Sequence, residues 1–293
     1  MKNILITGAS GMLGATLAEK LSDKFKVFGT GNSDYSNAPF NYLPFDLGKE
    51  DYSPLIEWSN PEIIIHCAAL TNGNECELNP TYAFEINGVT VQRLLKYTAD
   101  NVKFIYISTD AVYPSHLHLA KESDCTFPES VYGKSKEIGE FFLLNSLNRE
   151  YLIIRTTIVG LNKNNKHSGF VEWILNSVGN KNQIGLFADV LFSPISIWHL
   201  SQEIDFLISK NKFEEKVLNI AGNDITTKYA FGIALVRMFE LDEEQIKESS
   251  IEKFEFRAKR SMDQSLSVKK YQSMFNRRLP SLKDTIESIK INY

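Results

Sequence analysis

The 293-residue sequence has few cysteines, no long apolar run and little net charge. Its three cysteines show neither C-x-x-C nor zinc-ligand spacing, so we expect neither a disulfide scaffold nor a structural metal. The formal net charge of -4 excludes a strongly basic surface that would attract nucleic acid or an anionic membrane. No segment reaches the ~18 apolar residues of a membrane helix, and the first residues lack the apolar core of a signal peptide. We therefore expect a cytoplasmic protein that contacts neither nucleic acid nor membrane.

Short β-branched or aromatic runs alternate with longer amphipathic stretches over the first two thirds of the chain. This βαβ rhythm predicts an α/β fold with a parallel sheet. The runs 63–65 and 152–154 are apolar throughout, as expected of strands that helices cover on both sides. We therefore predict a doubly wound parallel Rossmann sheet. The predicted strands are 3–7, 26–30, 42–45, 62–67, 103–108, 151–155 and 217–220, and the predicted helices are 12–22, 82–97, 131–147, 170–176, 226–239 and 282–289.

The pattern becomes less regular after Arg155, beginning with a loop rich in Gly, Asn and Lys at 160–169. No Pro-rich or Ser-rich linker marks a boundary there. We predict a Rossmann domain at 1–160, which binds a dinucleotide. Residues 161–293 are predicted to form a smaller C-terminal lobe, which mainly binds substrate and is interleaved with the end of the sheet.

Three glycines, Gly8, Gly11 and Gly14, follow the first predicted strand and open the first predicted helix. A dinucleotide loop needs glycine for a tight turn, for close approach of the backbone to a pyrophosphate, and for packing of the helix on its strand. The position between strand and helix distinguishes this triplet from a chance match. The expected cofactor contacts in this loop are Gly8, Ser10, Gly11, Met12 and Leu13.

The end of the second predicted strand bears on the choice between NAD and NADP. An acid there would bind the ribose hydroxyls of NAD, whereas small polar or basic residues leave room for the 2′-phosphate of NADP. No acid precedes Asp34, and Asn32 and Ser33 favour NADP(H), while NAD(H) stays open. Further cofactor contacts are expected where the third and fourth strands end, at Asp46, Leu47, Ala68 and Ala69.

Tyr132 and Lys136 form a Tyr-x-x-x-Lys pair in the predicted helix 131–147. Residues four apart share one face of a helix, so the Lys136 ammonium would lie near the Tyr132 phenol. A nearby cation lowers the pKa of a phenol from its usual value of about 10 and makes the phenol a usable general acid or base. The preceding strand ends in the hydroxyls of Ser108 and Thr109, at the edge of the sheet where open α/β folds bind ligands.

Together these motifs resemble the extended short-chain dehydrogenase/reductase superfamily and, within it, the dTDP-4-dehydrorhamnose reductase family. The resemblance spans nearly the whole chain. The matching stretches are the three glycines, 68–71 with Glu77 and Pro80, Asn87, 108–113, Tyr132 with Lys136, 155–157, 192–194, and Arg260, Leu266 and Lys270 ahead of Leu279-Pro280.

The resemblance implies NAD(P)H-dependent reduction of the C4 ketone of a nucleotide-activated 4-keto-6-deoxy sugar, for deoxysugar or surface polysaccharide synthesis. Thr109 would hold the substrate oxygen, with Ser108 as the alternative. Tyr132 would protonate that oxygen, and Lys136 would tune Tyr132 and bind the nicotinamide ribose. The other expected contacts are Asn87 to the cofactor and Thr71, Ile158 and Arg260 to the substrate.

Two positions depart from the family pattern. Ile158 stands where the family usually has Trp, and Ser261 follows Arg260 where the family usually has Pro. A different nucleotide sugar therefore stays open. Two other functions stay open as well: an epimerase or dehydratase of nucleotide sugars with tightly bound NAD, and a non-catalytic dinucleotide-binding regulatory subunit, which the β subunit of methionine adenosyltransferase exemplifies. A homodimer is also left open.

Overall fold

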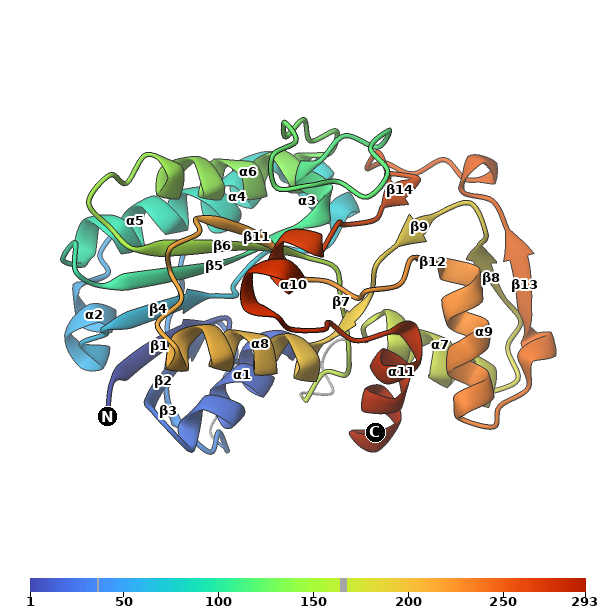
Figure 1. Ribbon diagram of the computed structural model, residues 1–293, viewed down its shortest axis with the longest axis horizontal. Coiled ribbons are helices and arrows are strands. Elements are labelled where there is room, and N and C mark those ends of the chain that lie inside the picture. Colours follow the sequence, from blue (N-terminus) through green and yellow to red (C-terminus); the bar gives the residue numbers. More distant parts are fainter. Residues whose placement is uncertain (36, 164–167) are drawn as a thin grey trace.

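The central sheet has seven parallel strands in the order β11-β6-β5-β4-β1-β2-β3 (Figure 1). The computed structural model describes residues 1–35, 37–163 and 168–293. The strand order reverses between β1 and β4, as in a doubly wound Rossmann fold, so the predicted fold class is confirmed. The strands are β1 (Asn3–Thr7), β2 (Lys26–Gly31), β3 (Asn41–Pro44), β4 (Ile63–His66), β5 (Lys103–Thr109), β6 (Tyr151–Thr156) and β11 (Val217–Asn219).

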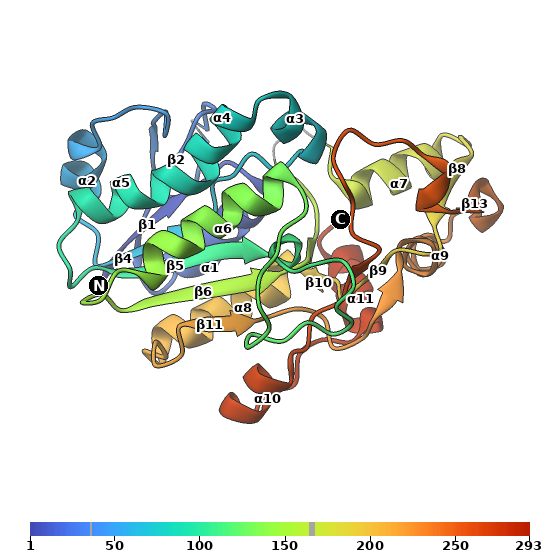
Figure 2. The same cartoon turned by 90° about the horizontal axis from the view of Figure 1, so that it is seen from above.

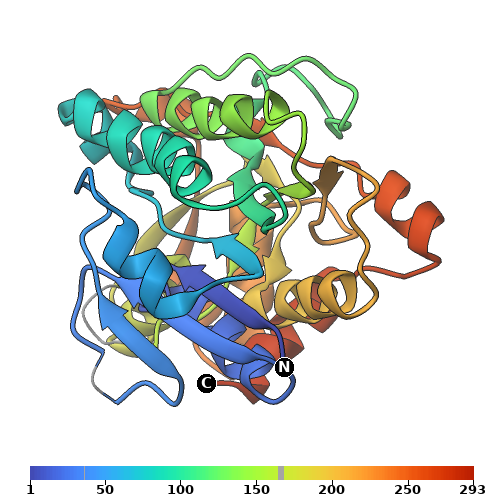
Figure 3. The same ribbon diagram turned by 90° about the vertical axis from the view of Figure 1, so that its left-hand side faces the viewer.

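Helices cover both faces of this sheet (Figures 1 and 3). Ile63 and Ile65 belong to the core on the side of α1 and α8, whereas Ile64 belongs to the core on the side of α2, α5 and α6. The strand is apolar throughout because both of its faces are buried. The helices of the two faces are α1 (Met12–Ser22) and α8 (Ile197–Ser209), and α2 (Ser53–Ser59), α5 (Thr90–Tyr97) and α6 (Val131–Leu144).

The predicted helix 82–97 is divided in the structure. α4 (Pro80–Phe84) passes into a π-helical turn over Glu85–Val89 and then into α5. A side chain of the sheet holds this turn in place: the hydroxyl of Tyr106, in β5, donates a hydrogen bond to the Asn87 carbonyl oxygen at 2.9 Å. π-helical turns inside α-helices are frequent near functional sites. This turn also places the Asn87 side chain, described below.

The sequence pattern does not predict α2, α3 (Gly73–Leu78) or α8. α2 and α3 have seven and six residues, which is too short for a helical period to stand out. α8 begins directly after a two-residue strand in the irregular part of the chain. α8 packs against α1, which is far away in the sequence, so the local sequence pattern does not reveal this contact.

A smaller lobe lies beyond the sheet end at which β5 and β6 finish (Figure 2). It has its own apolar core, formed by residues such as Ile174, Phe231 and Ile286. α8 and β11 return to the large sheet, and the division at residue 160 stays a prediction. The remaining elements are β7 (Ile158–Val159), α7 (Phe170–Gly179), β8 (Ile184–Phe187), β9 (Leu191–Phe192), β10 (Ile195–Ser196), β12 (Thr226–Thr227), α9 (Lys228–Met238), β13 (Ile246–Ser249), β14 (Asp263–Gln264), α10 (Lys269–Phe275), α11 (Leu282–Ile291) and the 3₁₀ turns Asp110–Val112, Glu243–Gln245 and Ile251–Lys253.

Residues 164–167 of the predicted loop 160–169 lie outside the described residues. Among the helices formed by the described part of the chain, none is long and apolar enough to cross a membrane.

Candidate active site

The glycine loop leaves the start of α1 open. Gly8 has a φ of +69°, and a Cβ atom there would lie 2.7 Å from the Ala68 nitrogen. A Cβ at Gly14 would lie 2.2 Å from the Gly8 carbonyl oxygen. Gly11 is the N-cap of α1 and has no side chain to cap the helix. The first turn of α1 is therefore available for an anion, which the free N–H groups and the helix dipole attract.

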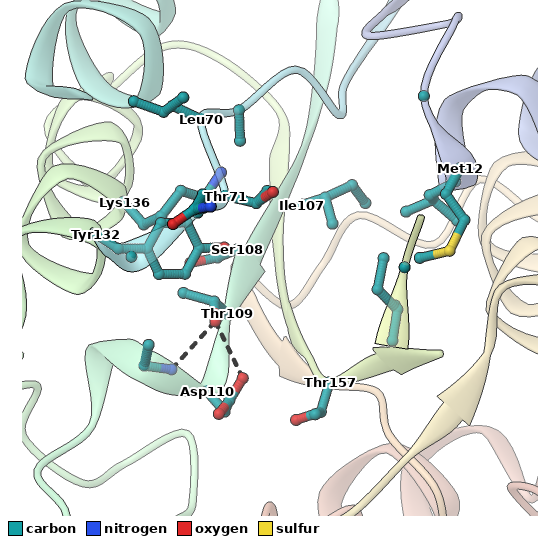
Figure 4. Close-up of a pocket in the computed structure, with 18 of the residues that line it drawn as sticks. Met12, Leu70, Thr71, Ile107, Ser108, Thr109, Asp110, Tyr132, Lys136 and Thr157 are labelled. Atoms are coloured by element: carbon teal, nitrogen blue, oxygen red, sulfur yellow. Dashed lines mark hydrogen bonds between the residues drawn. The ribbon is translucent and has the colours of Figure 1, made fainter. Parts of the chain in front are cut away.

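A cleft of about 1060 Å³ runs between this loop, the ends of β4 and β5, and the lobe. Figure 4 shows Tyr132, Lys136 and Thr109 on one side of the cleft and Met12 on the other. Such a crevice at the carboxyl ends of the strands is where open α/β sheets bind ligands. The predicted site residues that line it are Gly8, Ser10, Gly11, Met12, Leu13, Asn32, Ser33, Leu47, Ala68, Ala69, Thr71, Thr109, Tyr132, Lys136, Ile158 and Arg260.

Two predicted cofactor residues, Asp46 and Asn87, lie outside this lining. Asp46 is exposed and accepts a hydrogen bond from the Gly48 nitrogen at 2.9 Å, and it lines a second pocket that shares Asn32 and Tyr82 with the cleft. Asn87 is fully buried, and its amide is hydrogen-bonded to the backbone of the loop after β4. Asn87 thus shapes the wall of the cleft from behind. A direct cofactor contact by either residue stays a prediction.

Thr109 is held at the end of β5 by two hydrogen bonds (Figure 4). Its hydroxyl donates to Asp110 Oδ1 at 3.0 Å and accepts from the Ala111 nitrogen at 3.2 Å. A hydroxyl has one proton and two lone pairs. With the proton directed to Asp110, Thr109 offers its remaining lone pair as an acceptor.

Tyr132 and Lys136 lie one turn apart on α6, whose start is capped by Ser130 accepting from the Gly133 nitrogen at 3.1 Å. Lys136 is buried, and its Nζ lies 4.0 Å from the centre of the Tyr106 ring. Burial lowers the pKa of Lys136 to about 7, against the opposing effects of Cys67 and Glu140. Burial of an ammonium disfavours its charged form.

The pKa of Tyr132 is raised, which is opposite to the sequence-based expectation. Burial is the largest cause, and the nearby charge of Asp110 adds to it, while the Thr109 hydroxyl acts in the other direction. The expectation was wrong because it weighed the neighbouring lysine and not the loss of water around the phenol. At neutral pH Tyr132 is therefore a protonated phenol, as a proton donor must be.

Ser108 is directed into a different network from Thr109. Its hydroxyl donates to Glu140 Oε1 at 2.5 Å, and Arg155 Nη2 pairs with Glu140 Oε2 at 2.5 Å. Arg155 Nη1 also donates to the Tyr113 hydroxyl at 2.7 Å. All these side chains are buried. The Ser108 hydroxyl proton is thus taken by Glu140, whereas Thr109 Oγ1 keeps a lone pair for a ligand in the cleft. Thr109 is therefore better placed than Ser108 to bind a substrate.

Sequence reasoning did not select Asp110 or Lys228, and both line the cleft. Burial raises the pKa of Asp110, with the charge of Lys228 as the first opposing effect. Burial lowers the pKa of Lys228 to about 8, where Asp110 opposes the shift and Arg260 adds to it. The position of Asp110 directly after Thr109 was a usable signal. Lys228 had none, because it reaches the cleft from the first turn of a distant helix.

A parallel Rossmann sheet, a glycine loop and a cleft lined by Thr109, Tyr132 and Lys136 define an NAD(P)-dependent oxidoreductase of the extended short-chain dehydrogenase/reductase class. The chain belongs to the RmlD substrate binding domain family, whose model matches residues 1–292.

Three known proteins are similar to this chain in sequence or in structure. A dTDP-4-dehydrorhamnose reductase from Aggregatibacter actinomycetemcomitans is 30% identical over 243 residues, which cover 80% of this chain and 78% of the relative. The crystal structure of dTDP-4-dehydrorhamnose reductase from Bacillus anthracis str. Ames in complex with NADP matches with a TM-score of 0.85 and 23% identity, over 100% of both chains. The methionine adenosyltransferase 2 subunit beta of Xenopus tropicalis is 33% identical over 162 residues, which cover 54% of this chain and 47% of that protein.

Proposed function

We propose that this protein uses NADPH to reduce the C4 ketone of a nucleotide-activated 4-keto-6-deoxy sugar, in the synthesis of a deoxysugar for surface polysaccharide. The observation that carries the proposal is the meeting of Thr109, Tyr132 and Lys136 in one cleft with the glycine loop. The match to a dTDP-4-dehydrorhamnose reductase over 80% of this chain supports the same reaction.

The residues present fit a dinucleotide. A Cβ atom at Gly8 or Gly14 would clash with neighbouring backbone atoms. The absence of side chains here lets the loop pack closely, so that the first turn of α1 faces the cleft. The backbone from Ser10 to Leu13 would hold the pyrophosphate. Asn32 and Ser33 line the cleft after β2, and no acid precedes Asp34, which favours the 2′-phosphate of NADP over the ribose hydroxyls of NAD. When bound, the reduced nicotinamide supplies a hydride to the ketone carbon.

The chain's own residues supply the proton and the orientation. Tyr132, protonated because burial raises its pKa, donates its phenolic proton to the oxygen of the reduced carbonyl. Thr109 accepts a hydrogen bond with its free lone pair and thereby orients a hydroxyl of the sugar. Lys136 lies in the same lining and would bind the nicotinamide ribose.

The test is an assay of the purified protein with NADPH and dTDP-4-dehydrorhamnose, followed by the loss of the near-ultraviolet absorbance of the reduced nicotinamide. We expect sugar-dependent oxidation of NADPH and formation of the 4-hydroxy sugar. Reactions without sugar, and with NADH in place of NADPH, are the controls. Absence of oxidation with every 4-keto nucleotide sugar offered would refute the proposal.

The two other functions have distinct outcomes in the same preparation. An epimerase or dehydratase would co-purify with tightly bound NAD and convert the sugar without net consumption of NADPH. A regulatory subunit would bind the dinucleotide, leave the sugar unchanged and be recovered from its host with a partner enzyme. We also propose that the protein forms a homodimer. Light scattering after gel filtration should then give a particle mass twice that of one chain.

A further inference from the structure

Lys228 places a cation in the cleft from the lobe. It is the first residue of α9, and its backbone nitrogen donates to the Val190 carbonyl oxygen at 3.1 Å. The side chain lies over two aromatic rings: Nζ is 3.4 Å from the centre of Phe192 and 5.3 Å from that of Phe170. An ammonium over an aromatic face is held by the negative charge of the ring face. The cation is therefore fixed at one place in the cleft wall.

The ammonium of Lys228 has no carboxylate within ion-pair distance among the residues that the structure describes. Its side chain is half-buried and lines the cleft. Three N–H donors on one ammonium cannot all be satisfied by ring faces. Lys228 is thus free to donate to an oxygen atom of a ligand in the cleft.

Asp110 supplies a matching acceptor in the same cleft. The residue is 9% exposed, and its Oδ1 accepts from Thr109 Oγ1 at 3.0 Å. Its Oδ2 is buried and has no hydrogen-bond partner within bonding distance among the described residues, while burial raises the pKa of the Asp110 carboxyl and the nearby Thr157 hydroxyl acts to lower it. Leaving a buried carboxylate oxygen unpaired is costly, so a ligand that donates to Oδ2 would gain from the pairing. The bond between Thr109 and Oδ1 holds the Asp110 carboxylate in the same cleft lining as Tyr132.

We propose that Lys228 is a specificity-determining residue that donates a hydrogen bond to the hydroxyl on the sugar carbon next to the ketone, while Asp110 accepts the proton of that hydroxyl. The inference rests on the proposed function, which puts the ketone oxygen at Tyr132 and a sugar hydroxyl at Thr109. A hydroxyl needs an acceptor for its proton and a donor for a lone pair, and these two side chains supply one each. The preferred substrate is then an α-hydroxy ketone, and a sugar without that hydroxyl leaves Asp110 and Lys228 unpaired.

The kinetic test compares dTDP-4-dehydrorhamnose with its 3-deoxy analogue in the wild type and in Lys228→Met. Methionine keeps the length and the apolar contact with Phe192 and removes the donors. We expect wild-type kcat/KM to favour the hydroxylated sugar by about 100-fold or more, because a site built for a hydroxyl rejects its absence strongly. In the variant the preference should fall below about 10-fold, through loss on the hydroxylated sugar only. A preference that the substitution leaves unchanged overturns the inference.

A binding measurement keeps this test separate from the proposed reaction. Calorimetric titration of the protein with dTDP-rhamnose and with its 3-deoxy analogue requires no turnover. The wild type should bind the hydroxylated sugar nucleotide more tightly, and Lys228→Met should show a much smaller difference between the two compounds, because Asp110 remains as acceptor. If the wild type oxidises no NADPH, the proposed function fails while this titration still decides the role of Lys228. Equal wild-type affinities for the two compounds overturn the role even where reduction is observed.

Two further variants control for charge and packing. Lys290 also lies over a phenylalanine ring, with Nζ 4.8 Å from the centre of Phe239, but it belongs to α11 and is outside the cleft lining. Lys290→Met should keep the wild-type preference for the hydroxylated sugar. Lys228→Arg keeps charge and donors and should retain most of it. Loss of the preference in Lys290→Met, or its full loss in Lys228→Arg, would assign the effect to general charge or packing and overturn the inference.

Discussion

The side-chain amide of Asn87 forms hydrogen bonds with both the backbone N–H and the backbone C=O of Leu70. The Leu70 nitrogen donates to Asn87 Oδ1 at 2.7 Å, and Asn87 Nδ2 donates to the Leu70 oxygen at 3.0 Å. The same amide nitrogen donates to Ser135 Oγ at 2.8 Å. One buried side chain therefore ties the loop after β4, which lines the cleft, to the helix that carries Tyr132 and Lys136.

Replacing Asn87 by alanine should weaken both the fold and the cofactor site. The change leaves the buried polar groups of Leu70 unpaired, which costs about 1–3 kcal/mol in the free energy of unfolding. The loosened loop should also lower the affinity for NADPH several-fold. Urea unfolding and fluorescence titration measure the two effects. Asn145→Ala, which removes an exposed bond to the Phe141 oxygen, is the matched control and should change stability by less than about 0.5 kcal/mol. Equal effects of the two substitutions would contradict the role given to Asn87.

Tyr132→Phe should abolish most turnover while leaving cofactor binding in place. The substitution removes the phenolic proton and keeps the ring that fills the buried site. We expect kcat to fall by about 10²–10⁴-fold, the usual contribution of a positioned proton donor. The dissociation constant for NADPH, from fluorescence titration, should stay within about twofold of the wild type, because the lost group acts on the substrate oxygen. A variant that keeps wild-type kcat would assign the proton to another group.

The buried Lys136 should make the stability of the ligand-free protein depend on pH. Burial lowers its pKa from 10.5 to about 7. Between these two pH values the unfolded chain binds a proton that the native lysine does not, so the contribution of Lys136 to the free energy of unfolding rises with pH. Its burial penalty is fully present below pH 7 and is lost as the pH approaches 10.5.

This contribution can be isolated by comparing the wild type with Lys136→Met. The difference in unfolding free energy, wild type minus variant, should increase between about pH 7 and about pH 10 by an amount on the order of a few kcal/mol. Other groups, such as Lys228 with its own lowered pKa, are common to both proteins and cancel. Lys210→Met, at an exposed position, controls for loss of a positive charge. A difference that stays flat over this range would show that Lys136 is solvated in the native state.

The pair of Glu140 and Arg155 should be sensitive to removal of either partner. Both side chains are buried, and Arg155 Nη2 lies 2.5 Å from Glu140 Oε2. Glu140→Gln leaves the Arg155 charge without its partner and should lower the free energy of unfolding by about 3–5 kcal/mol. Glu287→Gln breaks an exposed pair with Lys283 at 3.6 Å and should cost less than about 1 kcal/mol. Chemical unfolding of the two variants measures both losses of unfolding free energy. Similar losses would mean that burial does not determine how much the Glu140–Arg155 pair contributes to stability.

Local pattern was sufficient for much of the molecule. The runs 63–65 and 152–154 predicted strands covered on both faces, and the structure places these strands inside a seven-stranded parallel sheet. The predicted bounds of β1 and α1 agree with the structure, because a glycine loop separates an apolar run from an amphipathic one. Tyr132, Lys136 and Thr109 were found for the same reason: strand end and helix spacing are features of neighbouring residues.

The tertiary structure decided what depends on burial and on distant segments. It placed Asn87 behind the cleft and Asp46 in an adjoining pocket, and it bonded the Ser108 hydroxyl, which also lines the cleft, to Glu140. It raised the pKa of Tyr132, although the adjacent helical turn carries a lysine, because burial removes water from the phenol and the charge of Asp110 acts in the same direction. Lys228 reached the cleft only through the packing of α9 in the lobe. Sequence determined which groups the protein has and their local spacing; desolvation and contacts between distant segments, which only the folded chain creates, decided what those groups face.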